Sequence, residues 1–193
     1  MWLCFCGARR REAIPLTGRS VGRVVVVVAL FVAVQQSAML EIRIGGIHPD
    51  VMVLLPIVAG LVAGPSSGAS MGFGAGLVAD LFLPTPFGLS ALVGTLIGFA
   101  VGAATLSLDR TAVWLPTAAA LVGSALYEVI YPVLGSIIGQ PQMLHVDLLR
   151  IVVVVAVANG IVAIPALRLV TWALPAASTQ GVPTSTAVTG MLR

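Results

Sequence analysis

The sequence has few charged residues and no lysine, and these two absences limit the class of protein it can be. Charged side chains make up 9% of the 193 residues, against about 25% in a typical soluble domain. Hydrophobic residues make up 59%, so a soluble fold would have too few polar side chains to cover its surface. The same composition excludes a disordered chain, a disulfide-rich secreted scaffold and a nucleic-acid binder. We therefore predict an integral membrane protein.

Cysteine and histidine are also scarce. The cysteines are Cys4 and Cys6 near the N-terminus, a spacing that offers neither a disulfide framework nor a metal site. His48 and His145 fall in separate polar segments, where we expect solvated side chains; an outer-face metal site with nearby aspartates is the less favoured alternative. Residues 64–68 spell G-P-S-S-G, which matches the nucleophile elbow in letters but lacks its strand–turn–helix setting. We expect no catalytic residue, no metal and no cofactor.

Apolar stretches follow one another along most of the chain. A transmembrane helix needs about 20 mostly apolar residues, and such stretches cover residues 24–40, 51–83, 88–108, 113–138 and 148–174. Glycine and proline interrupt the second stretch in its middle, which predicts two short helices joined by a tight turn. The sequence therefore predicts an all-α membrane bundle of about six transmembrane helices over residues 21–174. Residues 1–20 and 175–193 are expected to be cytoplasmic tails, the second one disordered.

The basic residues predict the orientation in the membrane. All ten are arginine, and cytoplasmic loops carry the excess of basic residues in membrane proteins. If the N-terminus is cytoplasmic, only Arg43 and Arg150 fall on the outer side. We therefore expect both termini to be cytoplasmic.

Glycine recurs every four residues in two of the expected helices. The two stripes consist of Gly68, Gly72 and Gly76, and of Gly94, Gly98 and Gly102. Because four residues turn a helix by about 400°, the members of each stripe lie on one face. Small residues let helix backbones approach closely in a membrane. We expect internal helix packing along these stripes, with docking of a partner helix as the alternative.

Two acidic residues, Asp80 and Glu128, lie well inside apolar stretches. A carboxylate in hydrocarbon is unfavourable, so each side chain should face the interior of the bundle, pair with another group, or stay protonated. Asp80 continues the first glycine stripe, where it either has a functional role or caps a loop. A rise of about 1.5 Å per residue puts Glu128 at nearly the depth of Asn159. We expect a hydrogen bond between these two side chains.

Three short motifs carry a resemblance to a known family. They are Pro49-Asp50 before an apolar helix, the run G-F-G-A-G-L-V-A-D-L at residues 72–81, and P-F-G-L at residues 86–89, which contains Gly88. In these motifs the sequence resembles the rod shape-determining protein MreD family, best over residues 47–102. The resemblance implies a non-enzymatic bacterial inner-membrane protein, with a bundle like the substrate-binding subunits of energy-coupling-factor transporters. It also implies functional surfaces at the glycine stripes and at outer loops near Pro49, Asp50 and Asp80.

The resemblance further implies a place in the cell-wall elongation machinery, which controls peptidoglycan synthesis and cell shape. The implied direct partner is MreC, which has a single membrane helix; MreB, RodA and a class B penicillin-binding protein are implied through the complex. The alternative function is a substrate-binding membrane subunit of a vitamin or metal transporter. That function would need polar or aromatic groups that converge on an outer cavity, and the outer loops contain few such groups.

Overall fold

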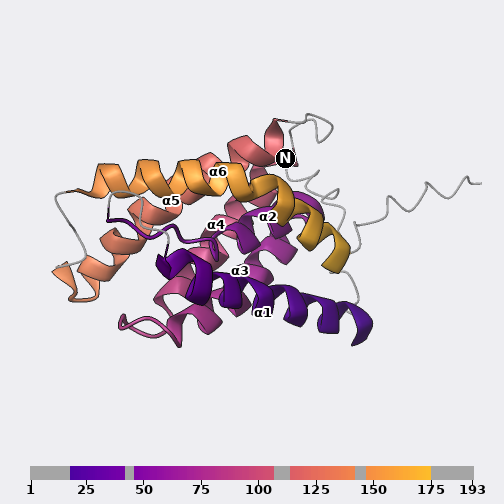
Figure 1. Ribbon diagram of the computed structural model, residues 1–193, viewed down its shortest axis with the longest axis horizontal. Helices are drawn as coiled ribbons and strands as arrows, with labels where there is room; N and C mark the ends of the chain where they lie inside the picture. The colour runs from indigo at the N-terminus through magenta and orange to yellow at the C-terminus, as the bar shows by residue number, and fades with distance from the viewer. Residues whose placement is uncertain (1–17, 42–45, 107–113, 142–146, 175–193) are drawn as a thin grey trace, which may run out of the picture.

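The computed structural model describes residues 18–41, 46–106, 114–141 and 147–174 of the chain (Figure 1). The helices are α1 (Gly18–Glu41), α2 (Leu54–Ala63), α3 (Pro65–Asp80), α4 (Leu89–Ala104), α5 (Leu115–Ile137) and α6 (Leu148–Ala173). This order confirms the predicted all-α bundle. The expected C-terminal tail and residues 1–17 of the expected N-terminal tail lie outside the described residues.

The helices fall into a long group and a short group. Within the described residues, the segments long and apolar enough to cross a membrane are Ser20–Ser37 of α1 and all of α5 and α6. Helices α3 and α4 have 16 residues each and α2 has 10. At about 1.5 Å per residue, 16 residues span about 24 Å, less than the roughly 30 Å of a hydrocarbon core. If the short helices cross the hydrocarbon core, they therefore need the help of adjoining non-helical residues or a thinner bilayer.

A tight turn joins α2 to α3, as the glycine and proline in the sequence predict. Gly64 has a φ of 90°, in the region where a Cβ would be strained. Pro65 follows as the first residue of α3, a position where its missing N–H leaves no helical hydrogen bond unmade. The chain reverses direction at this point with a single non-helical residue.

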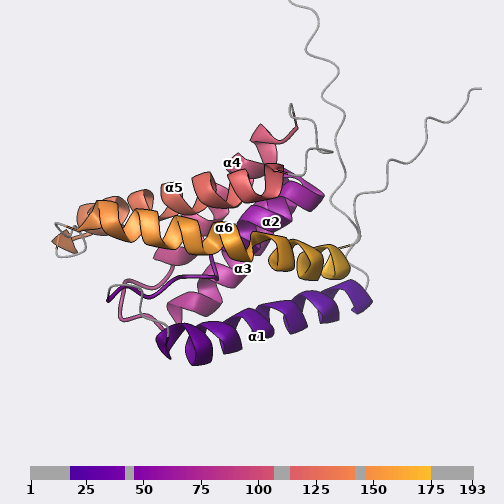
Figure 2. The same ribbon diagram turned by 45° about the horizontal axis from the view of Figure 1, so that its top comes forward.

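Helix α2 is the centre of the bundle. All of its residues from Leu54 to Leu61 are buried, and it packs against α3, α4, α5 and α6. One side of α2 joins an apolar cluster with α1 and α6, and its other side joins a second cluster with α4 and α5. Helix α1 lies on the outside of the bundle, and the C-terminal end of α6 approaches it in both ribbon views (Figures 1 and 2). Helices α3, α4, α5 and α6 thus surround α2.

Candidate functional site

The chain enters the bundle between α1 and α2 without forming a helix. Residues 48–51 are non-helical, with Pro49 and Val51 buried and Asp50 half-buried. Non-helical backbone is tolerated inside a membrane protein only where other protein groups satisfy its N–H and C=O groups. The outer loop expected near Pro49 and Asp50 stays a prediction, but the structure shows that this segment is packed into the bundle. The physical reason is that polar side chains from α1 and α6 meet this segment, which we call the extended segment.

Gln35 of α1 binds the extended segment on one side. Its Nε2 donates to the carbonyl of Pro49 at 3.3 Å, and its Oε1 accepts from the N–H of Val51 at 3.0 Å. One amide side chain therefore satisfies both a donor and an acceptor of the backbone, as a neighbouring β-strand would. This role of Gln35 was not predicted, although a glutamine within an otherwise apolar span is a signal that could have indicated it.

Asn159 of α6 binds the extended segment on another side. Its Nδ2 donates to the carbonyl of Asp50 at 2.8 Å and to Ser124 Oγ of α5 at 2.9 Å. Its Oδ1 has no hydrogen-bond partner among the residues that the structure describes. The expected bond between Asn159 and Glu128 is therefore not formed. Ser124, one helical turn before Glu128, takes the position on α5 that faces the asparagine, and Glu128 is only half-buried.

Asp80 caps the next helix along the chain. Its Oδ2 accepts from the N–H of Gly88 at 2.8 Å and of Ala91 at 3.4 Å, and its Oδ1 accepts from the N–H of Ser90 at 3.1 Å. The first N–H groups of a helix have no partner within the helix, and a negative charge there also interacts favourably with the helix dipole. Asp80 therefore closes the loop from α3 to α4. This contact joins the G-L-x-x-D and P-x-G-L motifs into one structural unit.

The two glycine stripes lie against each other at the interface of α3 and α4. A Cβ added at any of their six glycines would come closer than 3.0 Å to backbone of the facing helix or of the turn before α3. The two backbones therefore touch along the whole stripe, from Gly76 beside Ala91 to Gly102 beside Pro65. This arrangement is the internal packing that the sequence favours, and it leaves no stripe surface free for a partner helix.

A long groove opens on another face of α3. Its volume is about 890 Å³, and its walls are α1 on one side and α3 on the other. Valine and alanine line the α1 wall; serine, glycine and alanine line much of the α3 wall, and Leu81 and Phe82 lie at one end. At Gly74, an added Cβ would meet nothing within 4 Å. This face of α3, unlike the face toward α4, has room for additional atoms.

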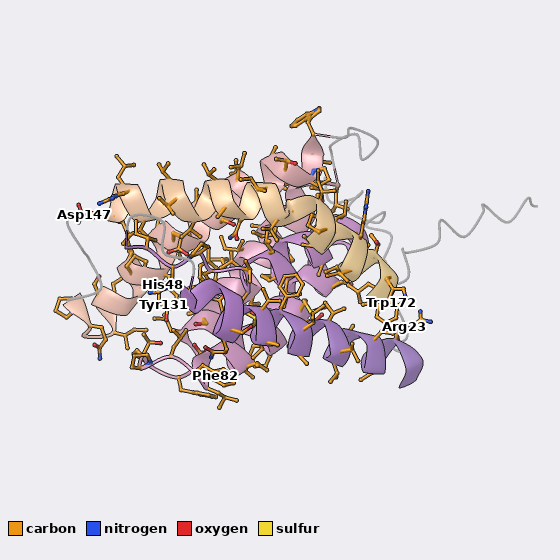
Figure 3. The ribbon with its side chains drawn as sticks, viewed as in Figure 1. Arg23, His48, Phe82, Tyr131, Asp147 and Trp172 are labelled. Atoms are coloured by element: carbon orange, nitrogen blue, oxygen red, sulfur yellow. The ribbon has the colours of Figure 1, made fainter. Side chains whose placement is uncertain are left out.

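Two side-chain contacts join elements near the ends of the bundle: one joins α1 to α6, and the other joins α5 to the loop between α3 and α4. The guanidinium of Arg23 in α1 lies 5.3 Å from the ring centroid of Trp172 in α6 (Figure 3). The hydroxyl of Tyr131 in α5 lies 2.9 Å from Thr85 Oγ1 in the loop between α3 and α4. Neither contact could be predicted from local sequence patterns, because each joins residues far apart in the chain.

A small cavity lies beside Asp50. Its volume is about 10 Å³, and Ser90 and Tyr127 also line it. Pockets for small organic ligands have about 300–1,000 Å³, so this cavity has room for one water-sized group. In the part of the chain that the structure describes, no three His, Cys, Asp or Glu residues are grouped so that they could hold a metal ion. His145 lies outside that part.

One comparison with known proteins identifies a relative of the chain. The family model described as rod shape-determining protein MreD matches residues 18–169, which is most of the chain. No curated protein and no solved structure matches it.

Proposed function

The chain belongs to the rod shape-determining protein MreD family, and from this premise we propose that it is a non-enzymatic binding subunit of the cell-wall elongation complex. Family membership and the apolar helices make it a rod shape-determining membrane protein. We propose further that it binds MreC, and through that complex MreB, RodA and a class B penicillin-binding protein. Its place would be the bacterial inner membrane, as a multi-pass protein with both termini cytoplasmic.

The groove between α1 and α3 is the observation that carries this proposal. Its walls are almost entirely apolar, so its occupant must itself be apolar and reach it from the bilayer. The residues on its α3 wall include Ser70 and Gly74, and small residues of this kind let a second helix approach closely in a membrane. A single transmembrane helix, as in MreC, has the required chemistry.

The closed interface between α3 and α4 supports the choice of the groove. Both glycine stripes are buried in the interface between α3 and α4, so a partner helix would need a different surface. The face of α3 that carries Gly74 combines open space with small residues. We therefore propose the α1–α3 groove, rather than the glycine stripes, as the partner-binding surface.

Transport of a vitamin or metal is the other function that the sequence raised. The cavity beside Asp50 has about 10 Å³, far less than the roughly 300 Å³ at the lower end for small-molecule sites. The larger groove is open along the side of the bundle and is apolar, which does not suit a polar vitamin. We do not propose transport.

A pull-down with two matched variants tests the proposal. Gly74→Leu adds a large side chain to the groove without a backbone clash, whereas Ala100→Leu adds the same side chain on an exposed position of α4. Both variants should be as thermostable in detergent as the native chain. Gly74→Leu should recover MreC from native membranes at least about tenfold less well, the equivalent of about 1.4 kcal/mol, and Ala100→Leu should recover it fully.

The opposite pattern would contradict the proposal. Full recovery of MreC by a stable Gly74→Leu variant would exclude the groove as its binding surface. Failure of the native chain itself to recover MreC, a RodA-type protein or a penicillin-binding protein would contradict membership of the complex. Recovery of paired ATP-binding subunits would favour transport instead.

A further inference from the structure

The small cavity beside Asp50 has a polar side and an apolar side. It lies where the extended segment, α3, α4 and α5 meet. Asp50, Ser90 and Tyr127 are its lining residues with oxygen-bearing side chains, and Val53, Ala75 and Ala79 are among the apolar ones. The cavity therefore combines hydrogen-bonding groups from three separate elements of the bundle in one small volume.

The hydroxyl of Ser90 is the strongest indication that the cavity has an occupant. Ser90 is 1% exposed, and its N–H donates to Asp80. Its Oγ has no hydrogen-bond partner within the described part of the chain. Nearly all buried polar groups in folded proteins have a partner, because one without a partner retains the full penalty of leaving water. Tyr127 lines the same cavity and interacts with Ser90 through its side chain, so the partner of the Ser90 hydroxyl is either Tyr127 itself or a group bound between the two.

Asp50 has acceptor capacity to share with that partner. Its Oδ1 accepts from the N–H of Met52 at 3.0 Å, and an ionised carboxylate has about four acceptor sites in all. Asp50 also lines the cavity. A group that donates to this carboxylate while bonding to the Ser90 hydroxyl would satisfy both side chains together.

The size of the cavity and its number of oxygen groups decide what that group is. A buried water needs about 10–15 Å³ of free volume and two to four polar partners, and this cavity has about 10 Å³ and three candidate residues. Mg²⁺ and Ca²⁺ take six or more oxygen ligands, which is more than these three side chains offer. The observations favour a water molecule over a metal ion.

We propose that the cavity is a binding site for one ordered water molecule, which bridges the carboxyl group of Asp50 and the hydroxyl of Ser90. Tyr127 closes the site on the side of α5. The water connects the extended segment to the first turn of α4, which Asp80 holds from the other direction. The extended segment then has three polar attachments: Gln35 on α1, Asn159 on α6 and this water on α4.

Two substitutions of Ser90 test the site by whether they lower or raise the Tm. If the water is present, Ser90→Ala removes one of its partners and should lower the Tm of the detergent-solubilised full-length protein by about 2–4 °C. Ser90→Val should lower it further, because the added methyl groups displace the water and leave Asp50 without it. If the cavity is dry and the Ser90 hydroxyl is unsatisfied, both variants should instead raise the Tm or leave it unchanged. If Ser90 bonds directly to Tyr127, the variants lower the Tm without a water, and a map of the native protein, which would then lack the water, overturns the proposal.

A matched control and a direct observation complete the experiment. Ser136→Ala removes a hydroxyl that bonds to the carbonyl of Val133 near the end of α5, and it should change the Tm by no more than about 1–2 °C. A map of the native protein that resolves ordered waters should show a peak about 2.7–3.0 Å from Ser90 Oγ and from an Asp50 carboxylate oxygen. A map without this peak, or a peak with the coordination of a metal ion, would overturn the proposal.

Discussion

Helix α3 has small residues on two faces, and the two faces are packed in opposite ways. On the face toward α4, glycine meets glycine and the backbones are in contact. On the face toward α1, Ser70 and Gly74 line an open groove of about 890 Å³. Small residues on one helix are thus not enough to close an interface.

The residues on the facing helix determine whether an interface of α3 is closed or open. Helix α4 carries Gly94, Gly98 and Gly102 opposite the stripe of α3, whereas α1 presents valines such as Val25, Val28 and Val32 to the groove. Close approach of two backbones in a membrane requires small side chains on both helices. Helix α1 is attached instead through the apolar cluster that it shares with α2 and α6, through Gln35, and through the contact of Arg23 with Trp172. One interface of α3 is therefore built from backbone packing, and the attachment of α1 includes separate polar contacts.

The largest effect is expected where the closed face is broken. Gly72→Leu forces a side chain into the backbone of Gly94, and because backbone cannot move aside as a side chain can, it should destabilise the fold by more than about 3 kcal/mol. The measurement is thermal unfolding of the purified protein in detergent. Gly74→Leu, two residues away on the open face, is the control and should unfold at nearly the native temperature. Equal stability of the two variants would contradict the distinction between the faces.

The next effect concerns the attachment of α1. Gln35→Leu leaves the carbonyl of Pro49 and the N–H of Val51 without the side chain that satisfies them, which should cost about 2–3 kcal/mol of folding free energy. Gln36→Leu is the matched control because Gln36 is exposed. Chemical unfolding of both variants in mixed micelles measures the difference. If Gln36→Leu proved the more damaging, α1 would not be attached in the way described.

A smaller effect is expected at the end of the closed face. Asp80→Ala removes the acceptor of three N–H groups at the start of α4 and should cost about 1–2 kcal/mol, the range of a lost helix cap. Asp80→Asn keeps one acceptor oxygen and should lose less. The unfolding temperature should therefore be highest for the native chain, lower for Asp80→Asn and lowest for Asp80→Ala. An Ala variant as stable as the native chain would show that the cap does not hold the loop.

The smallest effect is expected at the far end of α1. Arg23→Leu removes a cation–π contact, which at an exposed site contributes about 0.5–1 kcal/mol. Arg23→Lys should retain part of it. The change in the fluorescence of Trp172, compared in a background where the other two tryptophans are phenylalanine, measures the loss of the contact. An unchanged emission in Arg23→Leu would mean that the contact does not form in solution.

Local patterns of residues were sufficient for much of the fold. The apolar stretches and the scarcity of charge predict the membrane helices, because burying a charge in hydrocarbon is so unfavourable that composition alone signals it. The turn at Gly64 and Pro65 follows from the backbone limits of these two residues. The four-residue glycine spacing predicts a face for close helix packing, and the structure uses it in that way.

The contacts that give these patterns their roles depend on residues distant in the chain, and only the three-dimensional structure shows them. Asn159 lies 109 positions from Asp50, so no local spacing could distinguish this pairing from the expected one with Glu128. The entry of Pro49 and Asp50 into the bundle likewise depends on amide side chains from two other helices. Composition and periodicity determine which segments are helical, because helix formation and the cost of burying a charge depend on residues close together in the chain. Which faces close, which stay open and where a chain can be non-helical inside the bundle depend on the side chains that packing brings opposite them.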